Sequence, residues 1–152
     1  MCTTAIVIGY GNELRGDDAV GQRIARTIKS KGLSSVNSIA VHQLTPELAE
    51  LLATSKLAIF VDACVNFSSN QVQVKSLIPS DAKPVNGHIF NPELLLYLAE
   101  YLYGNSPEAW LITVPGVNFE LSEHISPTAE KGIATALSKI MEILDQGVMG
   151  NG

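Results

Sequence analysis

The sequence predicts an α/β fold: a three-layer α/β/α sandwich around a five-stranded, mainly parallel sheet, with one strand that could run antiparallel. Short apolar runs that suit buried strands alternate with stretches whose apolar residues recur at helical spacing. This alternation is typical of a sheet covered by helices on both faces. The 152 residues fit a single domain, residues 1–152, with a flexible tail from about residue 146.

Five segments have the composition of strands. Three of them, AIVIG, LAIFV and WLITV, are continuous apolar runs, as expected for strands that are covered on both faces. The segment QVQVKSL instead alternates between polar and apolar residues, which predicts a half-exposed edge strand and the one most suited to run antiparallel. In chain order the predicted strands are residues 5–9, 36–41, 57–61, 71–77 and 110–114.

Four helices are predicted between or after these strands. The first begins near Asp18, directly after a glycine-rich turn. The other three begin at residues 45–46, 91–92 and 126–127, where Thr, Asn or Ser can cap the helix and the following proline suits its first turn. The apolar side chains expected to face the sheet are Val20, Ile24 and Ile28; Leu48, Leu51 and Leu52; Leu94, Leu95, Leu98 and Leu102; and Ile133, Leu137, Ile140 and Leu144.

The composition argues against several classes of protein. Ten basic and 15 acidic residues give a net charge of −5, which disfavours binding to nucleic acid or to an anionic membrane surface. No run of 18 apolar residues could span a bilayer, and the N-terminal segment does not resemble a signal peptide. With only Cys2 and Cys64, a disulfide framework is not expected. We therefore expect a cytoplasmic protein that binds neither nucleic acid nor membranes.

Candidate metal ligands fall where functional sites gather in such sheets, beyond the C-terminal ends of the strands. Asp18 follows the first strand and Asp62 ends the third, so the two carboxylates would face one crevice if those strands are neighbours. His88 can approach from the loop before the third helix. Two carboxylates and an imidazole suit a borderline divalent ion such as nickel or zinc.

Ordinary structural roles are also open for these residues. An aspartate at a helix start, such as Asp17 or Asp18, commonly caps the helix or faces its dipole. A loop histidine such as His88 is often a plain surface residue. Cys64 has no evident base near it in the sequence, which favours a small buried residue over a nucleophile.

The glycine-rich turn does not match a nucleotide-binding motif. The dinucleotide fingerprint needs a glycine where Leu14 stands, and the acidic pair at the helix start would repel a pyrophosphate. The sequence contains no Walker loop and no HExxH, GxSxG or CxxC motif. A nucleotide-binding or phosphorylase-type enzyme is therefore disfavoured, although phosphate-dependent thermal stabilisation would revive it.

Residues 9–21 (GYGNELRGDDAVG) resemble the opening motif of the [NiFe]-hydrogenase maturation endopeptidases, G-x-G-N-x-L-x-x-D-[DE]-x-x-G. Residues 61–63 resemble the second acidic motif of that family, residues 87–88 its histidine motif and residues 115–127 its C-terminal segment. The resemblance covers essentially the whole chain. The stretches GNELRGDD and HQLTPELAE look most like the branch that serves soluble, bidirectional, NAD(P)-linked hydrogenases.

The chain departs from the family at residues 42–45. Many members carry an Asp-Gly-Gly-Thr type segment there, whereas this chain has His42-Gln43-Leu44-Thr45. The role of that aspartate is therefore not carried over. Whether His42 or Gln43 contacts the same partner is left open.

The resemblance implies a peptidase of the aspartyl type that removes a C-terminal extension from the hydrogenase large-subunit precursor after nickel insertion. Asp18, Asp62 and His88 would bind the nickel that the precursor carries. Asp18 and Asp62 would also be catalytic, whereas Asp17 would orient the first loop or act as a base. A monomer is expected to suffice for docking. A metal-sensing chaperone that binds the same precursor without cutting it is the alternative.

Overall fold

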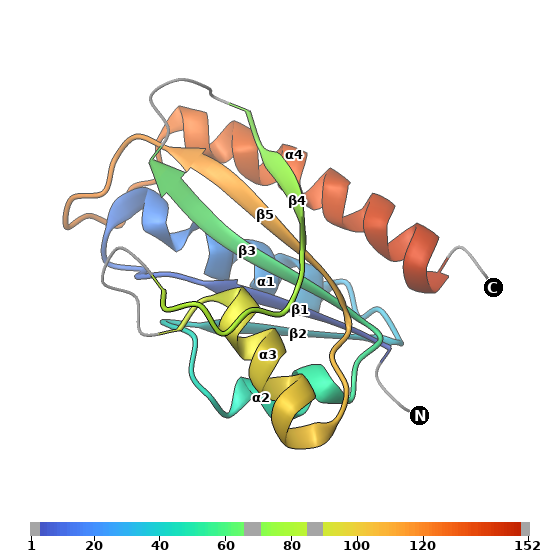
Figure 1. Ribbon diagram of the computed structural model, residues 1–152. Coiled ribbons are helices and arrows are strands. Elements are labelled where there is room, and N and C mark those ends of the chain that lie inside the picture. The colour runs from blue at the N-terminus through green and yellow to red at the C-terminus, as the bar shows by residue number, and fades with distance from the viewer. Residues whose placement is uncertain (1–3, 66–70, 85–89, 150–152) are drawn as a thin grey trace.

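The computed structural model describes residues 4–65, 71–84 and 90–149 and has the predicted α/β fold (Figure 1). The sheet order is β2-β1-β3-β5-β4, and only the edge strand β4 is antiparallel to its neighbour. This confirms the five-stranded, mainly parallel sheet and the edge position of residues 71–77. The strands are β1 (Ala5–Tyr10), β2 (Val36–Val41), β3 (Leu57–Val65), β4 (Gln73–Leu77) and β5 (Glu108–Gly116).

Helices cover both faces of the sheet, and each face has its own apolar core. Side chains of α1 and α4 pack on one face, and side chains of α2 and α3 pack on the other. Along β1, Val7 faces the first pair of helices while Ile6 and Ile8 face the second, which explains its continuous apolar run. The helices are α1 (Val20–Ser30), α2 (Leu48–Ala53), α3 (Pro92–Tyr103) and α4 (Pro127–Leu144), with a 3₁₀ turn η1 (Gly16–Ala19) and a π-helical turn η2 (Asp145–Met149).

Two of the three predicted proline-associated helix starts are confirmed. The side chain of Asn91 accepts a hydrogen bond from the Leu94 N–H at 2.8 Å, and the Ser126 hydroxyl accepts one from the Ala129 N–H at 3.1 Å. The third was wrong. Thr45 makes no cap at the start of α2, because its carbonyl closes a turn with the Leu48 N–H at 3.2 Å and the helix begins only there.

Two predicted core leucines are exposed instead. Leu51 of α2 is 39% exposed and Leu102 of α3 is 57% exposed. Leucines fill so many consecutive positions of α3 that they cannot all face the sheet, and the buried set is Leu95, Leu96 and Ala99.

The two central strands β3 and β5 run further than predicted. They pair in register from Leu57 with Glu108 to Val65 with Gly116. Backbone pairing between the two strands therefore continues beyond their apolar runs. Asp62 therefore lies inside β3 rather than after it. At the other end of the chain, η2 occupies residues within the predicted tail, and residues 150–152 lie outside the described residues.

Candidate functional site

Two glycines, Gly9 and Gly21, allow the turn that carries Asp18 to pack directly against the sheet. A Cβ atom on Gly9 would collide with the carbonyl of Gly21, and a Cβ on Gly21 would lie 2.6 Å from the carbonyl oxygens of Tyr10 and Val61. The start of α1 can approach β1 and β3 this closely only because both residues lack a side chain. The spacing of glycines in the first motif is thus a packing requirement.

Hydrogen bonds fold the first loop around the carboxylate of Asp18. The backbone N–H of Asn12 donates to Asp18 Oδ2 at 2.7 Å, while the Asn12 side-chain oxygen accepts from the Leu14 N–H at 2.9 Å. The buried side chain of Gln22 donates to the carbonyl of Gly11 at 2.7 Å. These contacts hold Asp18 at the C-terminal edge of the sheet.

Asp62 lies on β3 close to Asp18, in the crevice between adjacent strands that the sequence predicts. Because β1 pairs directly with β3, Gly9 opposite Val61, the turn after β1 comes next to Asp62. Burial and the charge of Asp18 raise the pKa of Asp62 from 3.8 to about 7, against the opposing effect of hydrogen bonds from the Ala63 N–H and the Tyr10 hydroxyl. Two carboxylates close together in a partly buried site repel each other. This repulsion favours either a proton kept on one carboxyl group or a cation bound between the two.

Tyr10 joins this acidic pair from the end of β1. Burial is the largest cause of its strongly raised pKa, followed by the charge of Asp62, its hydrogen bond to Asp62, and the charges of Glu93 and Asp18. Glu93 stands in the first turn of α3, so the N-terminus of that helix also lies near the pair. The sequence did not single out Tyr10 as a site residue, because a tyrosine at the end of an apolar strand is typical of a core residue.

Asp17 points away from the acidic pair and into the protein. It is fully buried, and its carboxylate accepts bonds from the backbone N–H groups of Val117, Asn118 and Ser126 and from the Ser126 hydroxyl, at 2.7 to 3.0 Å. Burial raises the pKa of Asp17, but these bonds outweigh it and leave a pKa below the ordinary 3.8. Of the two roles open for Asp17, the geometry favours orienting the loop over acting as a base.

The predicted third ligand, His88, lies outside the described residues. Within residues 4–65, 71–84 and 90–149, no three His, Cys, Asp or Glu side chains gather closely enough to hold an ion. The assignment of Asp18, Asp62 and His88 as metal ligands stays a prediction.

Cys64 has the properties of a structural residue. Burial raises the pKa of its thiol, and the nearby charge of Asp62 adds to this against a hydrogen bond with Thr113. A thiol with a raised pKa is a poor nucleophile, as the sequence predicts. The side chain is only partly buried, so the predicted burial is not confirmed.

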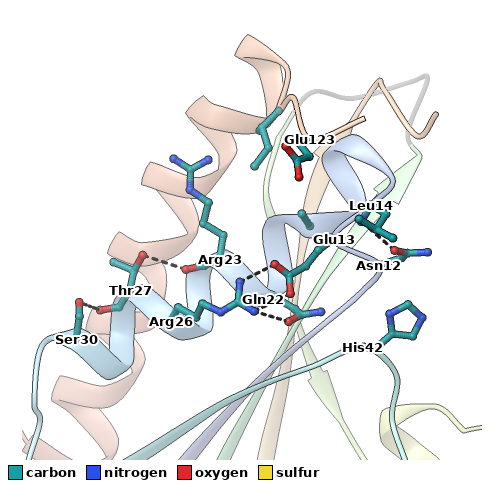
Figure 2. Close-up of a pocket in the computed structure, with 12 residues that line it drawn as sticks. Asn12, Glu13, Leu14, Gln22, Arg23, Arg26, Thr27, Ser30, His42 and Glu123 are labelled. Atoms are coloured by element: carbon teal, nitrogen blue, oxygen red, sulfur yellow. Dashed lines mark hydrogen bonds and ion pairs between the residues drawn. The ribbon is translucent and has the colours of Figure 1, made fainter. Parts of the chain in front are cut away.

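A groove of about 900 Å³ lies beside α1, and Asn12, Glu13 and Leu14 of the first loop are part of its lining (Figure 2). Its lining includes His42, whereas Asp18 and Asp62 are not part of it. Arg26 binds both carboxylate oxygens of Glu13 at 2.6 and 2.8 Å. These side chains are about half exposed, so the pair contributes little to stability. No pattern in the sequence predicted this groove.

Several solved structures that share this fold are hydrogenase maturation endopeptidases. The maturating endopeptidase HybD from E. coli is 20% identical, with 95% of this chain and 94% of that one covered and a TM-score of 0.79. The [NiFe] hydrogenase maturation protease HycI from Thermococcus kodakarensis KOD1 is 22% identical at the same coverages, with a TM-score of 0.74. The hydrogenase 2 maturation peptidase from Thaumarchaeota archaeon SCGC_AB-539-E09 is 21% identical, over 93% and 97% of the two chains, with a TM-score of 0.69.

The fold is therefore that of the hydrogenase maturation endopeptidases. The likeness extends over almost the whole chain. No family model and no curated protein matches the sequence. Among the described helices, none is both long and apolar enough to cross a membrane.

Proposed function

We propose that this protein is an endopeptidase that removes a C-terminal extension from the nickel-loaded large-subunit precursor of a [NiFe]-hydrogenase. One observation carries the proposal: on the fold of the maturation endopeptidases, Asp18 and Asp62 meet at the C-terminal edge of the sheet. The motif at residues 9–21 supports the same conclusion, because its residues build the turn that holds Asp18 there.

The nickel in this proposal belongs to the substrate. Asp18 and Asp62 offer carboxylate oxygens, and His88 would add an imidazole nitrogen, a mixed ligand set that suits a borderline divalent ion. A cation brought into the pair would relieve the repulsion between the two carboxylates and displace the proton that Asp62 otherwise retains near neutral pH. The protein would thereby bind the loaded precursor in preference to the empty one.

The roles of the three aspartates follow from their contacts. Asp18 and Asp62 are the catalytic carboxylates of the proposal, since both face the crevice at the edge of the sheet. Asp17 keeps the turn and the loop after β5 together, so its contribution to cleavage is indirect. We further propose that the enzyme acts as a cytoplasmic monomer, in the branch that serves soluble, bidirectional, NAD(P)-linked hydrogenases.

Intact-mass measurement of the precursor tests the function. Purified protein is incubated with nickel-loaded and with nickel-free precursor, and loss of the extension is expected only from the loaded form. Asp18→Asn and Asp62→Asn should each stop the mass loss, whereas Glu142→Gln, an exposed acid on α4, should not. Full-rate cleavage by Asp18→Asn would remove Asp18 from the mechanism. Binding of the loaded precursor by wild-type protein without mass loss would instead support the chaperone.

A further inference from the structure

Four large apolar side chains are exposed around the C-terminal edge of the sheet. Leu14 is 60% exposed, Val65 55%, Val117 64% and Leu121 74%. We call these four residues the apolar rim. In Figure 1 the loop after β5 (orange) projects at the same end of the molecule as η1 (blue) and the arrowhead of β3 (green).

Backbone pairing brings the apolar rim together as two pairs of side chains. Arg15 and Ser122 form a parallel bridge, with Gly16 N–H donating to the Ser122 carbonyl at 2.8 Å and Ser122 N–H to the Leu14 carbonyl at 2.9 Å. Leu14 and Leu121 each precede a bridge residue, so parallel register sets them side by side. On the neighbouring strands, Val65 pairs with Gly116, directly before Val117.

The apolar rim is held in place by contacts at its base. The Asp17 carboxylate binds the N–H of Val117, and a Cβ atom on Gly16 would lie only 2.5 Å from the carbonyl oxygen of Asn118. Gly16 also has a φ of 54°, which a residue with a side chain adopts only under strain. Exposed leucines and valines on loops this well fixed offer a preformed surface that loses little entropy on binding.

The apolar rim and the acidic pair lie at the same C-terminal edge of the sheet. Leu14 stands in the loop whose Asn12 N–H binds Asp18, and Val65 lies three residues after Asp62 on β3. Because side chains alternate along β3, Asp62 lies on the α2/α3 side of the sheet and Val65 on the α1/α4 side. This edge of the sheet therefore carries a negative site with apolar groups beside it. A complementary surface carries a cation opposite the acidic pair and apolar groups beside that cation.

We propose that the apolar rim is the docking surface for the folded large-subunit precursor. The proposal rests on the proposed function and extends it from the metal to the protein that carries it. Charge complementarity selects this occupant, because the acidic pair matches the metal centre while the apolar rim buries protein surface beside that centre. The apolar rim draws on the first loop, β3 and the loop after β5, so its partner is a folded surface rather than a short extended peptide.

Kinetics and binding of the nickel-loaded precursor test the docking surface. Leu14→Ser and Leu121→Ser should each raise KM, and the Kd from biolayer interferometry, about tenfold. We expect kcat to stay within about twofold, because the acidic pair is left unchanged. Leu14→Met keeps an apolar side chain and should therefore have the wild-type KM. This result would distinguish loss of apolar surface from distortion of the loop.

Leu102→Ser is the matched control. Leu102 is 57% exposed, but it stands near the end of α3, and the Asn105 side chain just beyond that helix binds the Ala53 carbonyl before β3 starts. It thus lies at the opposite edge of the sheet from the apolar rim. An unchanged KM and Kd in the Ser variants at positions 14 and 121 would overturn the docking proposal. The same rise in Leu102→Ser would overturn it as well.

Further outcomes distinguish failure of the docking surface from failure of the proposed function. Wild-type protein that binds the loaded precursor without cutting it refutes the peptidase, while the Kd values of the variants still decide the docking surface. Wild-type protein that neither binds nor cuts the loaded precursor overturns both proposals. If sedimentation shows a dimer that the serine substitutions dissociate, the apolar rim joins two copies of this chain and the docking proposal is wrong.

Discussion

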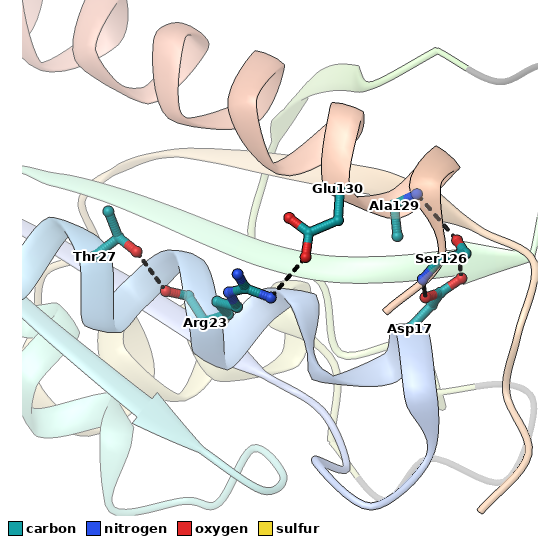
Figure 3. Close-up of polar contacts among 6 residues, drawn as sticks. All are labelled: Asp17, Arg23, Thr27, Ser126, Ala129 and Glu130. Carbon is teal, nitrogen blue, oxygen red and sulfur yellow. Dashed lines mark hydrogen bonds and ion pairs between the residues drawn. The ribbon is translucent and has the colours of Figure 1, made fainter. Parts of the chain in front are cut away.

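Ser126 donates two hydrogen bonds to the carboxylate of Asp17, from its backbone N–H to Oδ1 and from its hydroxyl to Oδ2, each at 2.7 Å (Figure 3). The same hydroxyl accepts the Ala129 N–H at the start of α4. One side chain thus caps a helix and ties it to the turn that carries Asp18. A carboxylate that receives so many donors is a structural centre of this end of the molecule.

Replacement of Asp17 should destabilise the protein strongly. Asp17→Asn loses the charge and turns amide hydrogens toward backbone donors, which should lower the free energy of unfolding by about 2–4 kcal/mol. Urea denaturation at pH 7 measures this loss. Ser126→Ala removes one bond to Asp17 and the α4 cap, and should cost less, about 1–2 kcal/mol. Equal losses for the two variants would show that the backbone donors to Asp17 matter little.

Acid should weaken the wild-type protein partly through Asp17. Because its folded pKa lies below the ordinary 3.8, the stability that Asp17 contributes is complete above that value and is lost as pH falls through the folded pKa. Urea denaturation at a series of pH values below about 4 should therefore show a steeper loss for wild type than for Asp17→Asn. Parallel curves for the two proteins would contradict this prediction.

Asp62 should act in the opposite direction. Its pKa of about 7 in the folded protein exceeds the ordinary 3.8, so the folded state binds the proton more tightly and stability falls as pH rises from about 4 to about 7. Asp62→Asn should match wild type at pH 4 and exceed it above pH 7 by up to about 4 kcal/mol. Thermal unfolding across this range is the measurement. Glu142→Gln controls for the change in net charge, and a pH-independent difference would contradict the prediction.

Gly9→Ala should strongly destabilise the protein, because α1 lies in close contact with β1 at this residue. The new Cβ would collide with the backbone carbonyl of Gly21, which cannot move without separating the helix from the sheet. We expect a loss above about 3 kcal/mol or no folded protein. Gly32→Ala is the control: its φ of 63° is strained but nothing lies within 4 Å of the new Cβ, so it should cost only about 1 kcal/mol. Similar stability of the two variants, measured in urea, would refute the packing argument.

Local sequence determined most of the framework. Continuous apolar runs predicted three of the five strands, and the polar alternation in QVQVKSL predicted the antiparallel edge strand. Asn91 and Ser126 predicted two helix starts. These features depend on neighbours within a few residues, which is why periodicity and capping chemistry reveal them. Where a local signal was ambiguous, as with the consecutive leucines of α3, burial was assigned wrongly.

Only the tertiary structure decided which residues meet. Asp17 binds partners 100 to 109 residues away, and no local pattern encodes such a distance. Likewise, Asp18 and Asp62 become neighbours because β1 pairs with β3. The sequence by itself determined the elements and the candidate acids, since these depend on short-range propensity. The order of strands and the shared acidic crevice depend on how the whole core packs, and that choice is made only when the chain folds.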